Sequence, residues 1–84
     1  VFPNPAVSGS SIALAFELGE KGRPVLQICD AAGVPVMERT LDELPVGPNR
    51  ITVTLPATMH TGIYWVQLFN GRQRASVALA VKGE

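Results

Sequence analysis

Two side chains of this sequence, Cys29 and His60, are of the types that carry nucleophilic catalysis or hold a metal. A histidine beside a cysteine can accept the thiol proton and so create a thiolate nucleophile. Cys29 ends an apolar run, where a buried thiol is inert, and His60 stands in a loop-like stretch where we expect a solvated side chain. One cysteine and one histidine also fall short of the usual structural zinc sets. We therefore predict no catalytic residue, no metal site and no cofactor.

The serines and carboxylates offer no catalytic arrangement either. Ser8, Ser10 and Ser11 lie in a polar turn that lacks the glycine pattern of a nucleophile elbow. The acidic residues are scattered, and no glycine-rich loop precedes a helical stretch, so neither paired carboxylates nor a phosphate cradle is indicated. Asp30 stands shortly before Gly33, which favours a turn-capping aspartate over a metal ligand. Since a chain this short can hardly enclose a substrate pocket, we predict that the protein is not an enzyme.

Aromatic and basic side chains offer two binding chemistries. Tyr64 and Trp65 are adjacent, and an exposed aromatic ring could stack on a sugar, but neighbours on a strand point to opposite faces, so only one can be exposed. Packing in the core or at an edge is the alternative for each ring. Arg72, Arg74 and Lys82 are cations near the end of the sequence. They form either a solvated surface or a contact for an acidic partner beside an open strand edge.

Composition limits the classes of protein further. With 84 residues, 46% of them hydrophobic and 17% charged, the chain is predicted to form a single globular domain over residues 1–84. Seven basic and seven acidic residues balance, which disfavours nucleic acid and anionic lipid as partners. No apolar run approaches the roughly 20 residues of a membrane helix, so we predict no membrane insertion. Because Val1 is neither an initiator methionine nor the start of a signal peptide, we expect a piece of a larger secreted or surface protein.

Apolar residues that alternate with a period of two predict strands along the whole chain. Asp30 to Gly33 is expected to turn a hairpin, with Val36 facing inward afterwards, and Asn70–Gly71 is expected at the centre of a type I′ turn. Prolines at both ends of the Pro3–Pro5 segment place the first short strand at an edge. The fold class predicted is an all-β, immunoglobulin-like antiparallel sandwich of about seven strands. The clearest strand segments are residues 12–18, 25–29, 34–41, 51–55, 62–70 and 73–82.

Five short turn or strand motifs follow one another along the chain, and their order is more specific than any one of them. They lie at residues 1–6, 26–33, 44–49, 62–68 and 77–82. They begin with Pro3-Asn4-Pro5, include Gly62-Ile63-Tyr64, and finish in a β-rich stretch. Together they resemble the C-terminal sorting domain of type IX secretion cargo, the Por secretion system C-terminal signal domain family. The similarity covers nearly the whole chain.

The resemblance implies an address that routes a folded protein of a Bacteroidetes-type bacterium through the periplasm to the cell surface or beyond. It implies two kinds of partner, the type IX translocon and a sortase-like signal peptidase. The peptidase would cleave upstream of the Pro3–Pro5 segment and join the cargo to anionic lipopolysaccharide. Some family members keep the domain as surface components of the secretion apparatus, so cleavage and retention both stay open.

The resemblance also assigns residues. The terminal segment is the recognition element, namely Val77, Ala78, Leu79, Ala80, Val81 and Lys82. Structural motif positions are Pro3, Asn4, Pro5, Asp30, Gly33, Gly47, Gly62 and Tyr64. Arg72 and Arg74 stay candidate charged contacts on the charge pattern alone, because the sequence departs here from the lysine pair that family members often carry.

A second interpretation is an immunoglobulin-like spacer, or a carbohydrate-binding accessory domain of an extracellular enzyme that uses Trp65. It predicts that a glycan titration changes the fluorescence of Trp65. The sorting interpretation predicts instead that a reporter fused ahead of the domain reaches the cell surface.

Overall fold

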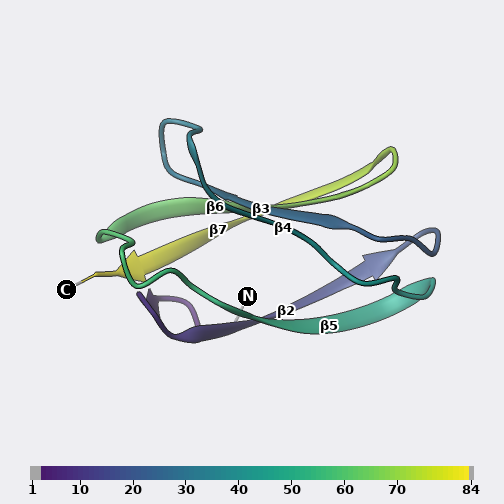
Figure 1. Ribbon diagram of the computed structural model, residues 1–84, viewed down its shortest axis with the longest axis horizontal. Helices are drawn as coiled ribbons and strands as arrows, with labels where there is room; N and C mark the ends of the chain where they lie inside the picture. The colour runs from purple at the N-terminus through teal and green to yellow at the C-terminus, as the bar shows by residue number, and fades with distance from the viewer. Residues whose placement is uncertain (1–2, 84) are drawn as a thin grey trace.

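A computed structural model describes residues 3–83, and every regular element in that range is a β-strand. The strands face one another in two layers (Figure 1), which confirms the all-β prediction. Their bounds are β1 Ala6–Val7, β2 Ser11–Leu18, β3 Val25–Cys29, β4 Pro35–Thr40, β5 Gly47–Thr54, β6 Gly62–Asn70 and β7 Gln73–Lys82.

One layer is a five-stranded sheet in the order β1-β7-β6-β3-β4, and the other contains only β2 and β5. Neighbouring strands are antiparallel except for β1, which runs parallel to β7 with Ala6 beside Val81 and Val7 beside Lys82. The short first strand therefore lies at a sheet edge, as the prolines before it predicted. The last strand has β6 on one side and β1 on the other.

The core lies between the two sheets and follows the predicted alternation. In β2 and β6 every second side chain faces inward, because successive side chains of a strand point to opposite faces. The buried apolar side chains of the core are Ala6, Ile12, Leu14, Leu18, Leu26, Ile28, Leu41, Val53, Leu55, Met59, Tyr64, Val66, Leu68, Leu79 and Val81. Every strand except β4 contributes to that set.

The β3–β4 hairpin turns where expected, but the prediction that Val36 faces the core is wrong. Ile28 pairs with Met37 and Cys29 with Pro35, so a β-bulge leaves Val36 between the two pairs. Val36 is 39% exposed, and Met37 packs against the core instead. The extra residue of the bulge shifts the alternation by one position, which no pattern of period two can show.

The β6–β7 hairpin also forms as predicted, with a different turn. Asn70 pairs with Gln73, so Gly71 and Arg72 are the central residues. Gly71 has a φ of 60°, and no residue other than glycine has a positive φ among residues 3–83. The type I′ prediction is therefore wrong, and the geometry is that of a type II′ turn, which needs glycine at the first central position only.

Strand β5 begins earlier than expected, at Gly47 instead of Ile51. Pro48 lies inside the strand, opposite Glu17 of β2. β5 pairs with β2 on one side only, and an edge strand tolerates a residue without an N–H donor. Gly47 adopts a φ of 101°, which lets the chain enter the strand from the preceding loop.

Candidate interaction surface

The terminal strand β7 divides the candidate recognition residues between the core and the surface. Leu79 and Val81 are buried between the sheets, whereas Ala78 and Lys82 are exposed on the outer face and Ala80 is half-buried there. Val77 points toward the other sheet at an open side of the sandwich and is 41% exposed. A partner of the folded domain can therefore reach the outer-face side chains, while Leu79 and Val81 hold the strand in place.

The Pro-Asn-Pro segment is fastened to the same strand by the side chain of Asn4. Its amide donates to the carbonyl oxygen of Ala78 at 3.3 Å, and its oxygen accepts from the N–H of Ala80 at 3.0 Å. The side-chain amide of Asn4 thus makes the two hydrogen bonds to β7 that a peptide group of a neighbouring strand would make. β1 continues the pairing from Ala6 onward. Pro3 and Pro5 are exposed on either side of Asn4.

After β7, the backbone of Gly83 packs closely against the backbone of residues 59–61. Its N–H donates to the hydroxyl oxygen of Thr61 at 2.9 Å. A Cβ at this position would lie 2.7 Å from the carbonyl oxygen of Met59 and 2.9 Å from the nitrogen of Thr61. The sequence shows Gly83 only as a residue beyond Lys82, yet the structure requires a side chain no larger than hydrogen there.

Asp30 and Gly33 form the predicted turn. The carboxylate of Asp30 accepts from the N–H groups of Ala32 and Val34, each at 2.9 Å, and Gly33 has a φ of 86°. Both acceptor distances belong to one oxygen atom, which agrees with turn capping.

Tyr64 is a buried corner residue at the start of β6. Its hydroxyl donates to the carbonyl oxygen of His60 at 2.8 Å, as a tyrosine corner does in immunoglobulin-like sandwiches. Gly62 lies opposite Val81 and has no atom near the place of a Cβ. Tyr64 therefore ties the β5–β6 loop to the core beside the end of β7.

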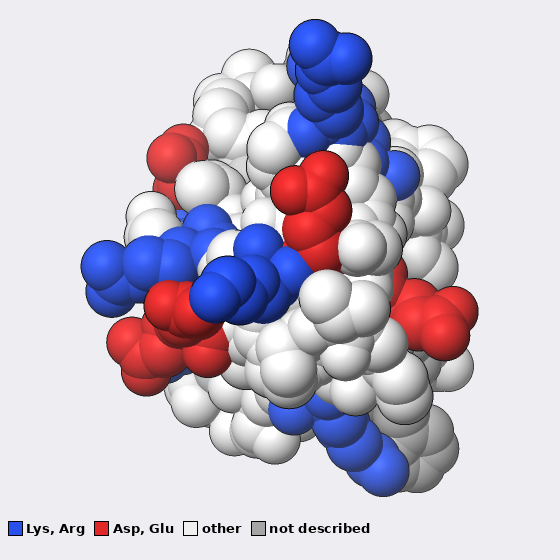
Figure 2. Space-filling view, turned by 90° about the vertical axis from the view of Figure 1, so that its right-hand side faces the viewer, with Lys and Arg blue, Asp and Glu red and all other residues white. Residues whose placement is uncertain are grey.

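Arg72 and Arg74 lie at and beside the turn of the last hairpin. The guanidinium carbon of Arg74 is 5.6 Å from the centre of the Phe69 ring, on the outer face. Arg72 is exposed in the turn. Figure 2 shows that basic and acidic side chains are mixed at this end of the molecule. These two cations therefore add local contacts rather than a field of one sign.

Cys29 and His60 have the surroundings that the sequence predicts. The thiol of Cys29 is buried and contacts the side-chain oxygen of Gln27 at 3.4 Å, while His60 is exposed in the loop before β6. Between residues 3 and 83 no three histidine, cysteine, aspartate or glutamate side chains lie close enough to hold a metal ion. The same range contains no helix that is long and apolar enough to cross a membrane.

A family model described as "Secretion system C-terminal sorting domain" matches residues 1–82. The chain belongs to this family. The sorting domain is therefore a C-terminal signal of type IX secretion, which implies interaction with that machinery and export to the cell surface or the extracellular space. The family is one of sorting signals and is not catalytic. The resemblance drawn from the five ordered segments is confirmed.

Solved structures support the fold of the sorting domain. An uncharacterized protein from Bacillus anthracis str. Ames is similar with a TM-score of 0.71 and 11% identity, covering 95% of this chain and 77% of that one. The extracellular domain of mouse leukocyte-associated immunoglobulin-like receptor 1, in a strand-swapped dimer, has a TM-score of 0.50 and 17% identity, covering 100% and 84%. The immunoglobulin-like prediction is confirmed. No curated protein matches the chain.

The side chains of two polar residues, Asn70 and Gln73, connect the two sheets of the sorting domain through hydrogen bonds that the sequence did not predict. Asn70 donates to the carbonyl oxygen of Glu20 at 2.9 Å. Gln73 donates to the carbonyl oxygen of Glu17 at 2.6 Å and accepts from the N–H of Gly19 at 2.9 Å. These bonds fix the last hairpin to the end of β2 and to the β2–β3 loop. Their partners are 50 residues or more away, so no local signal reveals them.

Proposed function

We propose that the type IX translocon recognises this domain in its folded state through the outer face of β7, with Ala78, Ala80 and Lys82 as the contact side chains. The observation that carries the proposal is the family match over residues 1–82, joined to the position of the recognition segment in an accessible final strand. Val77, Leu79 and Val81 then support the surface from within.

A rigid backbone supports this reading. A translocon that accepts many cargoes needs one portable surface, and β7 is held on one side by β6 and on the other by Asn4 and β1. A backbone that strand pairing already holds loses little further freedom on binding, which lowers the entropic cost of recognition. Lys82 adds one exposed cation at the end of this surface.

We further propose that a sortase-like signal peptidase at the cell surface processes the junction upstream of the Pro3–Pro5 segment, after transit of the cargo through the periplasm. The attachment of Asn4 to β7 supports this proposal, because it holds the Pro3–Pro5 segment beside the recognition strand. The mass of the surface-exposed cargo distinguishes cleavage from retention, because a cleaved cargo lacks the mass of this domain and a retained one includes it.

Removal of residues 77–84 is a poor test, because it also removes two core side chains, Leu79 and Val81. Loss of export would then report unfolding as readily as lost recognition. Charge reversal on the outer face, by Ala78→Glu with Lys82→Glu, alters the surface and leaves the core unchanged. A matched control makes the same change of charge at two exposed positions elsewhere, by Lys21→Glu with Ala31→Glu.

The experiment measures how much of a fused reporter reaches the surface of a type IX competent strain. We expect the outer-face variant to be retained in the periplasm and the control to be exported like the unaltered domain. Both variants should unfold at similar urea concentrations. Equal export of the two variants would refute recognition through this face of β7.

One observation favours a second candidate, a carbohydrate-binding accessory role. Trp65 is 43% exposed on the outer face of the five-stranded sheet, beside the small side chain of Ala78. Its ring is therefore accessible for stacking. A change in Trp65 fluorescence during titration with an oligosaccharide series would support this role, and the loss of that change in Trp65→Ala would assign it to the ring.

A further inference from the structure

The edge of β7 that faces away from β6 is covered along part of its length. Near the end of the strand, β1 and the side chain of Asn4 pair with residues from Ala78 onward. From Gln73 to Val77, the backbone of no other strand within residues 3–83 pairs with this edge. We call the stretch from Arg74 to Val77 the open edge.

The hydrogen-bonding direction of the open edge follows from its register. In an antiparallel pair, alternate residues direct their N–H and C=O groups to the partner, and the residues between them direct theirs away. Ala78, Ala80 and Lys82 bond to Asn4 or Ser8 on the side away from β6. Because the pairing of β7 with β6 has no register shift, the backbone groups of Arg74 and Ser76 point the same way. They offer two donors and two acceptors to an added strand.

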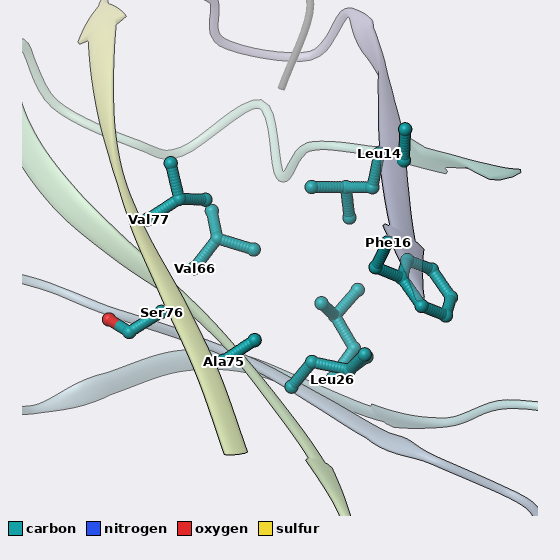
Figure 3. A pocket seen from close by; sticks show the side chains of 9 residues that line it. Leu14, Phe16, Leu26, Val66, Ala75, Ser76 and Val77 are labelled. Atoms are coloured by element: carbon teal, nitrogen blue, oxygen red, sulfur yellow. The ribbon is translucent and has the colours of Figure 1, made fainter. Parts of the chain in front are cut away.

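An apolar opening of about 120 Å³ lies directly inside the open edge, between β7 and β2. Figure 3 shows Ala75 and Val77 directed toward Leu14 and Leu26 across this opening, and Ser76 directed away from it. Cavities of roughly 150 Å³ lined by aliphatic and aromatic side chains hold a group as large as benzene. The opening therefore has room for about one apolar side chain. Its lining is Leu14, Ala15, Phe16, Leu26, Val66, Leu68, Ala75, Ser76 and Val77.

The smaller sheet is incomplete on the same side. Immunoglobulin-like sandwiches of the constant type have roughly three or four strands in each layer, whereas β2 pairs here with β5 alone. The edge of β2 opposite to β5 therefore borders the opening, as its lining residues Leu14 and Phe16 show. An extended segment placed between β2 and β7 would cover two strand edges at once.

We propose that the open edge is a strand-addition site for an extended segment of a partner protein. The segment pairs with Arg74 and Ser76, places one apolar side chain in the opening, and carries an acidic residue next to Arg74. The proposal rests on the proposed function in one respect: the partner is a component of the export machinery. It makes β7 a strand that is read along its edge as well as on its outer face.

Two features favour a strand as the occupant. The site continues an interface that already exists, since β1 adds to the same edge of β7 a few residues further along. The unpaired groups repeat every second residue, as the groups of a strand do, and an added strand alternates its side chains between the opening and the outer face. On the outer face, an acidic side chain opposite Arg74 forms a favourable cross-strand pair.

The test uses the whole chain and a defined probe, the peptide acetyl-Thr-Val-Thr-Val-Asp-Val-Thr-amide. We expect saturating peptide to slow hydrogen exchange at the N–H groups of Arg74 and Ser76 at least tenfold, and to shift the methyl resonances of Leu14 and Val77. With the aspartate opposite Arg74 in an antiparallel arrangement, the second threonine of the peptide pairs with Ser76. A control peptide with proline in place of that threonine lacks a donor to β7 and should bind at least tenfold more weakly.

Two variants separate the backbone from the opening. Ser76→Pro removes an N–H that points away from β6, so the β6 ladder is kept, and Ser76→Thr is the matched control that retains the donor. Ala75→Leu fills the opening and leaves every donor in place. We expect Ser76→Pro and Ala75→Leu to weaken peptide binding at least tenfold and Ser76→Thr to bind like the unaltered chain.

Three results would overturn the proposal. The first is no protection of Arg74 and Ser76 at millimolar peptide. The second is protection of both groups in the free chain by residues that precede Pro3. The third is protection that depends on protein concentration, with a dimer in sedimentation, which would make a second copy the occupant. Unchanged reporter export by Ala75→Leu despite lost peptide binding would refute the export partner and leave recognition through the outer face intact.

Discussion

Replacement of Asn4 by alanine tests how the opening motif of the domain supports its last strand. Asn4 makes two hydrogen bonds to the backbone of β7, to Ala78 and from Ala80. A hydrogen bond contributes about 0.5–1.5 kcal/mol net. Because the bond from Asn4 to Ala78 is long, at 3.3 Å, we expect Asn4→Ala to lower the free energy of unfolding by about 1–2 kcal/mol, a factor of roughly 5–30 in the folded population. Urea unfolding of the purified domain measures the loss.

Hydrogen exchange locates the effect. The N–H of Ala80 has the side-chain oxygen of Asn4 as its acceptor, so in Asn4→Ala it should exchange about 5–30 times faster. Asn4→Asp keeps an acceptor for that N–H and should preserve more of its protection than alanine does. Asn49→Ala is the control, because the side chain of Asn49 bonds only locally at the start of β5, to the carbonyl oxygens of Pro45 and Gly47. Equal exchange at Ala80 in Asn4→Ala and the unaltered domain would show that Asn4 does not fasten β7.

Three further changes have defined outcomes. Leu79→Ala, at a side chain with 0% exposure, should cost about 2–5 kcal/mol in urea unfolding, and a smaller loss would mean that β7 is not part of the core. Gln73→Ala removes one bond to Glu17 in β2 and one to Gly19 in the β2–β3 loop and should cost about 1–3 kcal/mol. Faster exchange at Gly19 is its signature, and unchanged exchange there would contradict the connection between the sheets. In Gly83→Ala the added Cβ would collide with the backbone of Met59 and Thr61, so we expect the hydrogen bond from the N–H of residue 83 to Thr61 to break and this N–H to exchange faster. Unchanged exchange would show that the surrounding backbone moves aside and keeps the bond.

The strands were predictable because a two-layer sandwich forces alternate burial on most of its strands. Ile12, Leu14 and Leu18 show this rule plainly, and all of them are buried. Asp30 and Gly33 were predictable for a local reason, since the carboxylate bonds to backbone groups two and four residues away. Features that depend on neighbouring residues can be read from a sequence.

Features that depend on distant residues could not be read. Asn70 and Gly71 match a type I′ turn locally, but the side chain of Asn70 bonds to Glu20 and ends the strand instead. The bulge at Val36 depends on how β4 pairs with β3. Neither the bonds of Asn4 to β7 nor the incomplete cover of its edge has a local signature, because both arise when the two ends of the chain meet.

The candidate recognition residues show the same division. The sequence indicated the whole segment from Val77 to Lys82, without distinguishing its members. The structure buries Leu79 and Val81 and exposes Ala78 and Lys82. The alternation of a strand with one covered face produces this difference.

The most direct test of the central claim, that this domain alone is an export address, is a fusion of residues 1–84 behind a folded periplasmic reporter. Surface protease accessibility of the reporter is measured in a type IX competent strain and in an otherwise identical strain without the translocon. We expect accessible reporter in the first strain and protected, periplasmic reporter in the second. Protected reporter in both strains, with the domain folded, would contradict the claim.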